Sequence, residues 1–118
     1  MAEAGIFIGW GASTPGREAK GLEVFNESVA YWGKLQEDGK IESFEVVLLT
    51  PHGGDLEGFA LLRGSRDQVG TLIVDEEFER TTARATLIVQ HVGIVPAVLG
   101  EGLGRSIGIY QEEIAGVA

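Results

Sequence analysis

The side chains best suited to acid–base chemistry are two histidines, His52 in TPHGGDLEG and His91 in IVQHVG. Histidine is the residue whose ordinary pKa allows proton transfer near neutral pH. The two lie far apart, outside any H-x-H or H-E-x-x-H spacing, and the chain has no cysteine. Such a set does not match a zinc site. The sequence therefore predicts no metal and no cofactor, and any catalysis would be acid–base chemistry at a histidine.

Three residues are candidates for a ligand-binding site. His91 lies in an apolar run, on the strand face expected to carry Val89, Gly93 and Val95. It is either a core histidine with a hydrogen-bond partner or an acid or base that lines a cavity. Trp10 ends an apolar strand between two glycines, which allow close approach of a ligand or a partner chain; core packing is the alternative. Arg63 ends a later strand, as a solvated charge or an anion contact at a cavity mouth. Convergence of these three residues on one enclosed pocket would favour an enzyme.

Two glycine-bearing stretches are better explained by backbone geometry than by chemistry. In TPHGGDLEG, Gly53 and Gly54 indicate a hairpin turn on which His52 is solvated. GASTPGRE has the glycine spacing of a phosphate-binding loop, but Arg17 and Glu18 stand where that loop needs Lys and Ser or Thr. We expect a tight strand-to-helix turn there, and no nucleotide.

Composition excludes several partners. The 118 residues carry a net charge of −9 and no cluster of basic side chains, so neither nucleic acid nor a membrane surface is expected as a partner. The apolar runs are far shorter than a membrane span, and the first residues lack the basic segment of a signal peptide. The absence of cysteine fits a cytoplasmic protein. Length predicts a single domain over residues 1–118.

The elements that would position the candidate residues follow from hydrophobic periodicity. Residues 5–11 predict a strand, followed by a helix with Thr14 as N-cap and Pro15 in its first turn. Strands are expected at 41–50 and 57–65, joined by the glycine turn. Residues 66–84 predict a helix that breaks at Asp75, which would cap a second segment. A long strand at 86–100 and a short C-terminal helix complete the order. The first helix should bury an apolar stripe: Leu22, Phe25, Val29, Trp32 and Leu35.

The order β-α-β-β-α-β with right-handed connections predicts an α+β ferredoxin-like sandwich, a four-stranded antiparallel sheet with the two main helices on one face. The strands place apolar residues on both faces, as in 41–50, where Phe44 and Val46 oppose Val47 and Leu49. The uncovered apolar face marks an interaction site, and a homodimer with face-to-face sheets is the economical solution. The C-terminal helix, with its stripe of Leu103, Ile107, Tyr110 and Ile114, would dock on the partner.

The element order and three segments carry a family resemblance: PHGGDLEGF at 51–59, LLRGS at 61–65 and DEEF at 75–78. The chain resembles the dimeric α/β-barrel superfamily, which includes YCII-related proteins, muconolactone isomerases and cofactor-independent antibiotic-biosynthesis monooxygenases. More narrowly, it looks like small YCII-like bacterial proteins of unknown function. The resemblance implies a homodimer and a cavity beside each sheet for a small apolar or aromatic ligand. The His and Asp pair typical of YCII-like proteins has no counterpart here, so no catalytic residue is carried over.

Three functions follow as hypotheses. The first is a dimer that binds a small apolar molecule in a cavity beside the sheet. The second is a cofactor-independent monooxygenase or isomerase, with His91 as acid or base, Trp10 as an aromatic wall and Arg63 as an anion contact. The third is a protein-interaction module without a ligand, which is favoured if packed side chains fill the sheet face.

Overall fold

The computed structural model describes residues 2–117, and its centre is a four-stranded antiparallel sheet. The strands are β1 (Ala4–Trp10), β2 (Ser43–Leu48), β3 (Gly58–Gly64) and β4 (Gly93–Val98), in the spatial order β2-β3-β1-β4. β1 lies in the middle and pairs with β3 on one side and β4 on the other, while β2 and β3 form the expected hairpin. The predicted ferredoxin-like α+β fold is confirmed.

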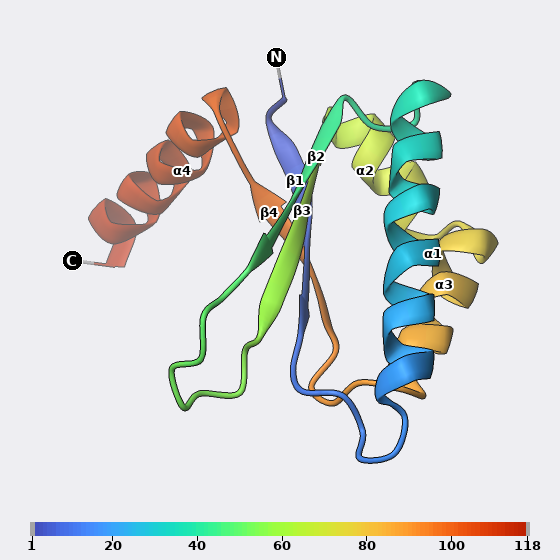
Figure 1. Cartoon of the computed structure of the whole chain (residues 1–118). Coiled ribbons are helices and arrows are strands. Elements are labelled where there is room, and N and C mark those ends of the chain that lie inside the picture. The colour runs from blue at the N-terminus through green and yellow to red at the C-terminus, as the bar shows by residue number, and fades with distance from the viewer. Residues whose placement is uncertain (1, 118) are drawn as a thin grey trace.

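The helices are divided between the two sides of the sheet (Figure 1). α1 (Glu18–Glu37), α2 (Arg66–Ile73) and α3 (Glu76–Thr86) lie together on one side. α4 (Glu101–Val117) stands on the opposite side, and its axis runs away from the sheet. We call the face that carries α1, α2 and α3 the helical face, and the other the open face.

Strict alternation along the central strands builds the core. Ile6 and Ile8 of β1 pair with Leu62 and Ala60 of β3, and all four point to the helical face with at most 8% of their surface exposed. The helices contribute Trp32, Leu35, Leu72 and Phe78 to the same cluster. Burying each large apolar side chain contributes roughly 1.5–3 kcal/mol. The core therefore fixes which face of each strand meets the helices.

The start of α1 differs from the prediction. The helix begins at Glu18, Arg17 occupies the N-cap position, and no side chain among the described residues caps it. Thr14 is not the cap because it lies three residues before the N-cap position, and its amide donates to the carbonyl of Ile88 at 2.9 Å, in the turn after α3. Pro15 and Gly16 form a turn before the helix, with Gly16 at φ 85°.

The break at Asp75 is confirmed. α2 ends at Ile73, and the carboxylate of Asp75 accepts a hydrogen bond of 3.1 Å from the amide of Phe78, as an N-cap does. Such a cap stabilises a helix by about 1 kcal/mol. Ser65 caps α2 in a reciprocal capping box with Gln68. Both short helices therefore begin where their side chains satisfy the first free amides.

The predicted strand at 86–100 is wrong in its first half. α3 continues to Thr86, and residues 87–92 form a turn in which Ile88 is buried in the core. The apolar letters TLIV favour a strand, but Leu87 is 68% exposed and the amides of Ile88 and Val89 both donate to the carbonyl of Ala85. His91 is therefore not in a strand; it lies exposed in this turn, with φ 57°.

The conformation of His91 gives a testable consequence. A left-handed backbone is tolerated by Gly, Asn, Asp and His better than by other residues, and it costs a residue with a branched Cβ roughly 1–2 kcal/mol. We expect His91→Val to lower the free energy of unfolding by about that amount. His91→Asn should leave it nearly unchanged. Urea denaturation of both variants checks this, and equal losses would contradict the left-handed turn.

The open face remains apolar in the single chain. The side chains there come from alternate positions of all four strands: Phe7, Val47, Phe59, Leu61, Val95 and Ala97. The rings of Phe7 and Phe59 stack with centroids 5.1 Å apart. α4 does not cover this face, because its only buried residue is Gly102, while Leu103, Ile107, Tyr110 and Ile114 are about half exposed or more. Among residues 2–117, no helix is long and apolar enough to cross a membrane.

Candidate functional site

A cavity of about 540 Å³ lies between α1, the helical face of the sheet and the turn after α3. Ligand pockets typically measure roughly 300–1,000 Å³ and are largely apolar. The wall of this cavity contains three aromatic side chains, Trp10, Phe25 and Trp32. Aliphatic residues complete it: Ile8, Leu22, Val24, Leu48, Ile88, Val89 and Val92.

Small residues on α1 explain why this space is hollow. The helix directs Gly21, Val24 and Ser28 toward the sheet, and all three are buried. The hydroxyl of Ser28 donates a hydrogen bond of 2.8 Å to the carbonyl of Val24, so it presents little polarity to the cavity. Leu22, which the predicted stripe places in the core, is 62% exposed. Small residues at helical spacing could have indicated this cavity from the sequence, but the larger apolar residues of the predicted stripe drew attention away from them.

Trp10 is held in the wall by close packing against a glycine. A Cβ atom on Gly58, its partner in β3, would lie 2.9 Å from the indole ring and 2.8 Å from the carbonyl oxygen of Val47. Phe25 of α1 meets the indole edge-on, with centroids 5.9 Å apart. The indole therefore bridges the sheet and α1 at one end of the cavity.

His91 lies beside the cavity rather than in its wall. Gly11 lines the cavity, and a Cβ atom there would lie 3.1 Å from the imidazole of His91. A Cβ atom on Gly11 would also lie 2.9 Å from each of the carbonyl oxygens of Asp55 and Gln90. Gly11 thus allows the loop before α1 and the turn of His91 to pack closely at the cavity edge.

Arg63 does not share this site. Arg63 pairs with Gly5 of β1, and the odd-numbered positions of β1 and β3 face the open side of the sheet. The side chain of Arg63 therefore lies on the open face, whereas Trp10, at an even-numbered position, lies on the helical face. Its guanidinium forms an ion pair of 2.5 Å with Glu45 of β2. Trp10, Arg63 and His91 therefore do not converge on one pocket, because the strand register places Arg63 on the other face of the sheet.

His52 braces the hairpin turn. Its Nδ1 accepts from the amide of Gly54 at 3.1 Å, and its Nε2 lies 2.6 Å from the carbonyl oxygen of Leu56, so the proton is on Nε2. The residue is exposed, as expected for the turn. Among the described residues, no three His, Asp or Glu side chains form a group that could hold a metal ion.

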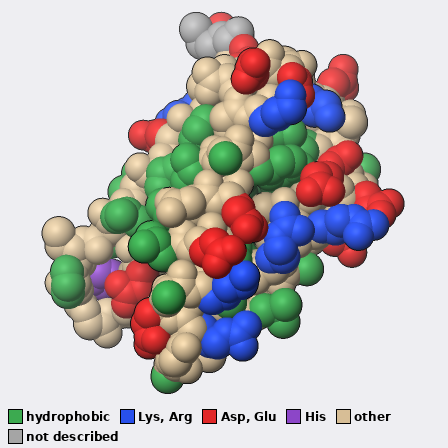
Figure 2. Space-filling view, turned by 45° about the vertical axis from the view of Figure 1, so that its right-hand side comes forward, with side chains coloured by type: hydrophobic (Ala, Val, Ile, Leu, Met, Phe, Trp, Pro, Cys, Tyr) green, Lys and Arg blue, Asp and Glu red, His purple; other side chains and the backbone are tan. Residues whose placement is uncertain are grey.

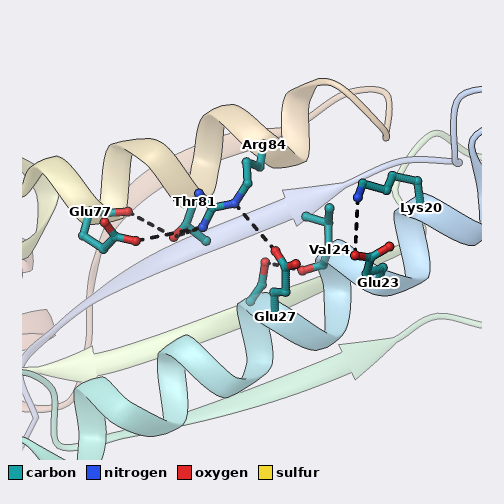
Figure 3. Close-up of polar contacts among 8 residues, drawn as sticks. Lys20, Glu23, Val24, Glu27, Glu77, Thr81 and Arg84 are labelled. Carbon is teal, nitrogen blue, oxygen red and sulfur yellow. Dashed lines mark hydrogen bonds and ion pairs between the residues drawn. The ribbon is translucent and has the colours of Figure 1, made fainter.

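Carboxylates dominate the charges around the cavity. Glu18 and Glu57 line it, and none of its described lining residues is Lys, Arg or His. Two of the nearby basic side chains form ion pairs: Arg84 lies 3.7 Å from Glu27, and Lys20 lies 3.3 Å from Glu23 (Figure 3). Figure 2 shows basic and acidic side chains interleaved over this side of the molecule.

Tyr31 of α1 carries the one strongly shifted pKa among the side chains of residues 2–117. Its hydroxyl oxygen is buried and has no hydrogen-bond partner among residues 2–117. Burial, together with the nearby carboxylates of Asp75 and Glu77, raises the pKa of Tyr31 from 10.0 to about 12. The phenol packs against the core where α2 meets α3, outside the cavity wall.

This shift predicts a loss of stability in alkali. Between pH 10 and about 12 the unfolded chain releases the Tyr31 proton while the folded chain retains it, so stability falls as pH rises through that window. We expect Tyr31→Phe to reduce this fall and to leave the behaviour at lower pH intact. Urea midpoints across the alkaline range check it, with Tyr110→Phe, an exposed tyrosine, as the matched control. Identical slopes in Tyr31→Phe and wild type would contradict the assignment.

Comparison with known proteins assigns the fold class. No family model matches the chain, and no curated protein matches it. A dimeric protein of unknown function with a ferredoxin-like fold from Bacteroides fragilis is similar over 81% of this chain and 96% of its own, with 16% identity and a TM-score of 0.58. An EthD family protein from Bacillus halodurans is similar over 83% of this chain and 99% of its own, with 7% identity and a TM-score of 0.65. SnoaB, a cofactor-independent oxygenase from Streptomyces nogalater, is similar over 85% of this chain and 96% of its own, with 13% identity and a TM-score of 0.53.

These likenesses establish a ferredoxin-like protein. At such low identities they carry the fold alone, and no particular family is shown. Membership of the YCII-like group therefore remains a prediction.

Proposed function

We propose that residues 1–118 form one domain that assembles as a homodimer, and that each subunit binds a small apolar molecule in the cavity beside the sheet. The observation that carries the binding proposal is the cavity of about 540 Å³ with its three aromatic walls. Its opening and its apolar lining match the general chemistry of small-molecule sites.

The homodimer is supported by the two unpartnered apolar surfaces on the same side of the chain. The open face presents Phe7, Phe59 and Leu61, and α4 presents Leu103, Ile107 and Ile114. A second copy in face-to-face orientation would cover both, with α4 reaching onto the partner. Apolar patches of this kind mark interaction sites. The similar protein from Bacteroides fragilis is itself described as dimeric.

A cavity-filling variant tests the binding proposal. Ser28→Leu places an apolar side chain in the cavity, whereas Ala30→Leu makes a comparable change on the exposed side of the same helix. The probe is N-phenylnaphthylamine, a neutral dye whose fluorescence rises in apolar surroundings. We expect saturable binding to wild type and to Ala30→Leu, and at least a tenfold weaker signal with Ser28→Leu.

Two outcomes would overturn the binding proposal. One is no saturable binding by folded wild type, which would favour the interaction module without ligand. The other is equal binding by Ser28→Leu and Ala30→Leu, which would place the dye elsewhere, for example on the open face.

The enzyme remains a second candidate because the imidazole of His91 lies at the cavity edge beside Gly11. In that role His91 would accept a proton from a bound naphthol, and dioxygen would oxidise the naphtholate to a naphthoquinone, with one oxygen atom entering the ring and the other leaving as water. Oxygen uptake in the presence of naphthols tests it. Uptake by wild type that is lost in His91→Asn, which keeps the backbone conformation, would support the enzyme, and no uptake would eliminate it for this substrate class.

A further inference from the structure

The cavity combines aromatic walls with an excess of negative charge. Trp10, Phe25 and Trp32 line it together with the two carboxylate residues Glu18 and Glu57, and none of its described lining residues is basic. A cation over an aromatic ring within about 6 Å is attracted by the π electrons. Carboxylates at the same wall would add to this attraction, and both would oppose a bound anion.

The surrounding basic groups do not reverse this sign. Arg84, next to Ala85 of the cavity wall, is engaged by Glu27 at 3.7 Å and by Glu77 at 4.0 Å (Figure 3). Arg63, the expected anion contact, lies on the open face against Glu45. The whole chain has nine basic and eighteen acidic residues, so the long-range field is also negative.

Two features near the cavity favour anions: the amino end of α1, and Arg17, the exposed N-cap residue, which does not itself line the cavity. The amino end of α1 lies at Glu18, and a helix carries roughly half a positive charge at that end. Glu18 is in the first turn, where its own full negative charge opposes the dipole, and it accepts a hydrogen bond from the amide of Gly16 at 3.2 Å. Glu57 adds a second full negative charge, so the two carboxylates outweigh Arg17 and the helix dipole together.

We infer that the cavity selects apolar molecules that carry a protonated amine over those that carry a carboxylate. This inference rests on the proposed binding function and adds the charge of the ligand to it. The aromatic and aliphatic walls would hold the hydrocarbon part, and Glu18 and Glu57 would stabilise the ammonium group.

Three probes with one hydrocarbon skeleton test the selectivity: naphthylmethylamine, naphthylmethanol and naphthylacetate. Calorimetry gives their affinities. Both tryptophans of the chain line the cavity, so the indole N–H signals in a proton–nitrogen correlation spectrum report whether each probe enters it. We expect the amine to bind at least about tenfold tighter than the acid, with the alcohol between them, as a charge contact combined with a cation–π contact would produce.

Removal of the carboxylates separates their effect from that of the overall charge. The double variant Glu18→Gln/Glu57→Gln should lose most of the preference for the amine and keep its affinity for the alcohol. Glu112→Gln/Glu113→Gln removes the same charge from the exposed α4, away from the cavity, and should keep the preference.

The outcomes distinguish the two proposals. If no probe perturbs the indole signals, the binding function itself fails. If all three bind with equal affinity, or the acid binds best, the apolar cavity stands and the inference about charge is overturned. A preference for the amine that survives in Glu18→Gln/Glu57→Gln would also overturn the assigned role of the carboxylates.

Discussion

Phe59→Asp is expected to convert the proposed homodimer to a folded monomer. Phe59 stacks on Phe7 in the middle of the open face, where the proposed partner would bury it. Two-fold symmetry places one unpaired carboxylate on each side of the interface, and burying an uncompensated charge costs about 3 kcal/mol or more. The dissociation constant should therefore rise more than about a hundredfold. Sedimentation velocity over a range of concentrations measures it.

The matched control is Leu87→Asp. Leu87 is 68% exposed at the end of α3, on the helical side of the sheet, and should not contact the partner. Circular dichroism would establish that both variants are folded. A dimer that persists in Phe59→Asp would eliminate the open face as the interface, and a wild type that is monomeric at micromolar concentration would eliminate the dimer.

Trp32→Ala is expected to cause the largest loss of stability. Trp32 is 4% exposed, lines the cavity and packs edge-on against Phe44 of β2, with centroids 6.2 Å apart. Replacing a buried tryptophan by alanine costs about 3–5 kcal/mol, because transfer energy is lost and a larger void remains. Domains are stable by only about 5–15 kcal/mol, so much of the folded state is at risk. Urea denaturation gives the difference in free energy of unfolding.

Leu22→Ala provides the comparison on the same helix. Both residues belong to the apolar stripe expected from sequence, but Leu22 is 62% exposed. We expect it to change stability by less than about 1 kcal/mol, as surface substitutions usually do. Equal losses in the two variants would mean that α1 presents a different face to the sheet.

These two residues show how far periodicity determines a helix. The recurrence of Phe25, Val29, Trp32 and Leu35 correctly places one side of α1 on the sheet, because large apolar residues dominate the pattern. It misplaces Leu22, since at the start of the helix the buried side consists of Gly21, Val24 and Ser28. Small residues contribute little to an apolar stripe, although here they leave room for the cavity.

Backbone hydrogen bonding explains the other differences. Asp75 and the glycine turn were predictable because their signals are local: a capping carboxylate and residues that accept unusual backbone angles. Thr14 and residues 87–90 obey a longer-range constraint, the pairing of the loop before α1 with the turn after α3. That pairing removes Thr14 from the helix and ends the apparent strand around TLIV. His91 is displaced with it.

The site could be predicted only in part for the same reason. Trp10 lines the cavity and packs against Gly58 and Phe25, so its position fits both alternatives that the flanking glycines left open. Arg63 is separated from it by strand register: Trp10 pairs with Gly58, so only even-numbered residues of β3 share its face. A shift of one residue reverses every side chain of a strand, and the sequence of one strand alone does not reveal its register.

The two outer strands of the sheet have a consequence for how many copies associate. An exposed strand offers unpaired amides and carbonyls to which further chains can add, and charged residues or proline interrupt such growth. β2 carries Glu45, ion-paired to Arg63, in the middle of its length, and β4 carries Pro96, which has no amide hydrogen to donate. Association through either edge strand is therefore disfavoured. Association through the open face buries that face in both copies and leaves none free for a third. We expect the protein to stop at a closed pair at high concentration instead of extending into filaments.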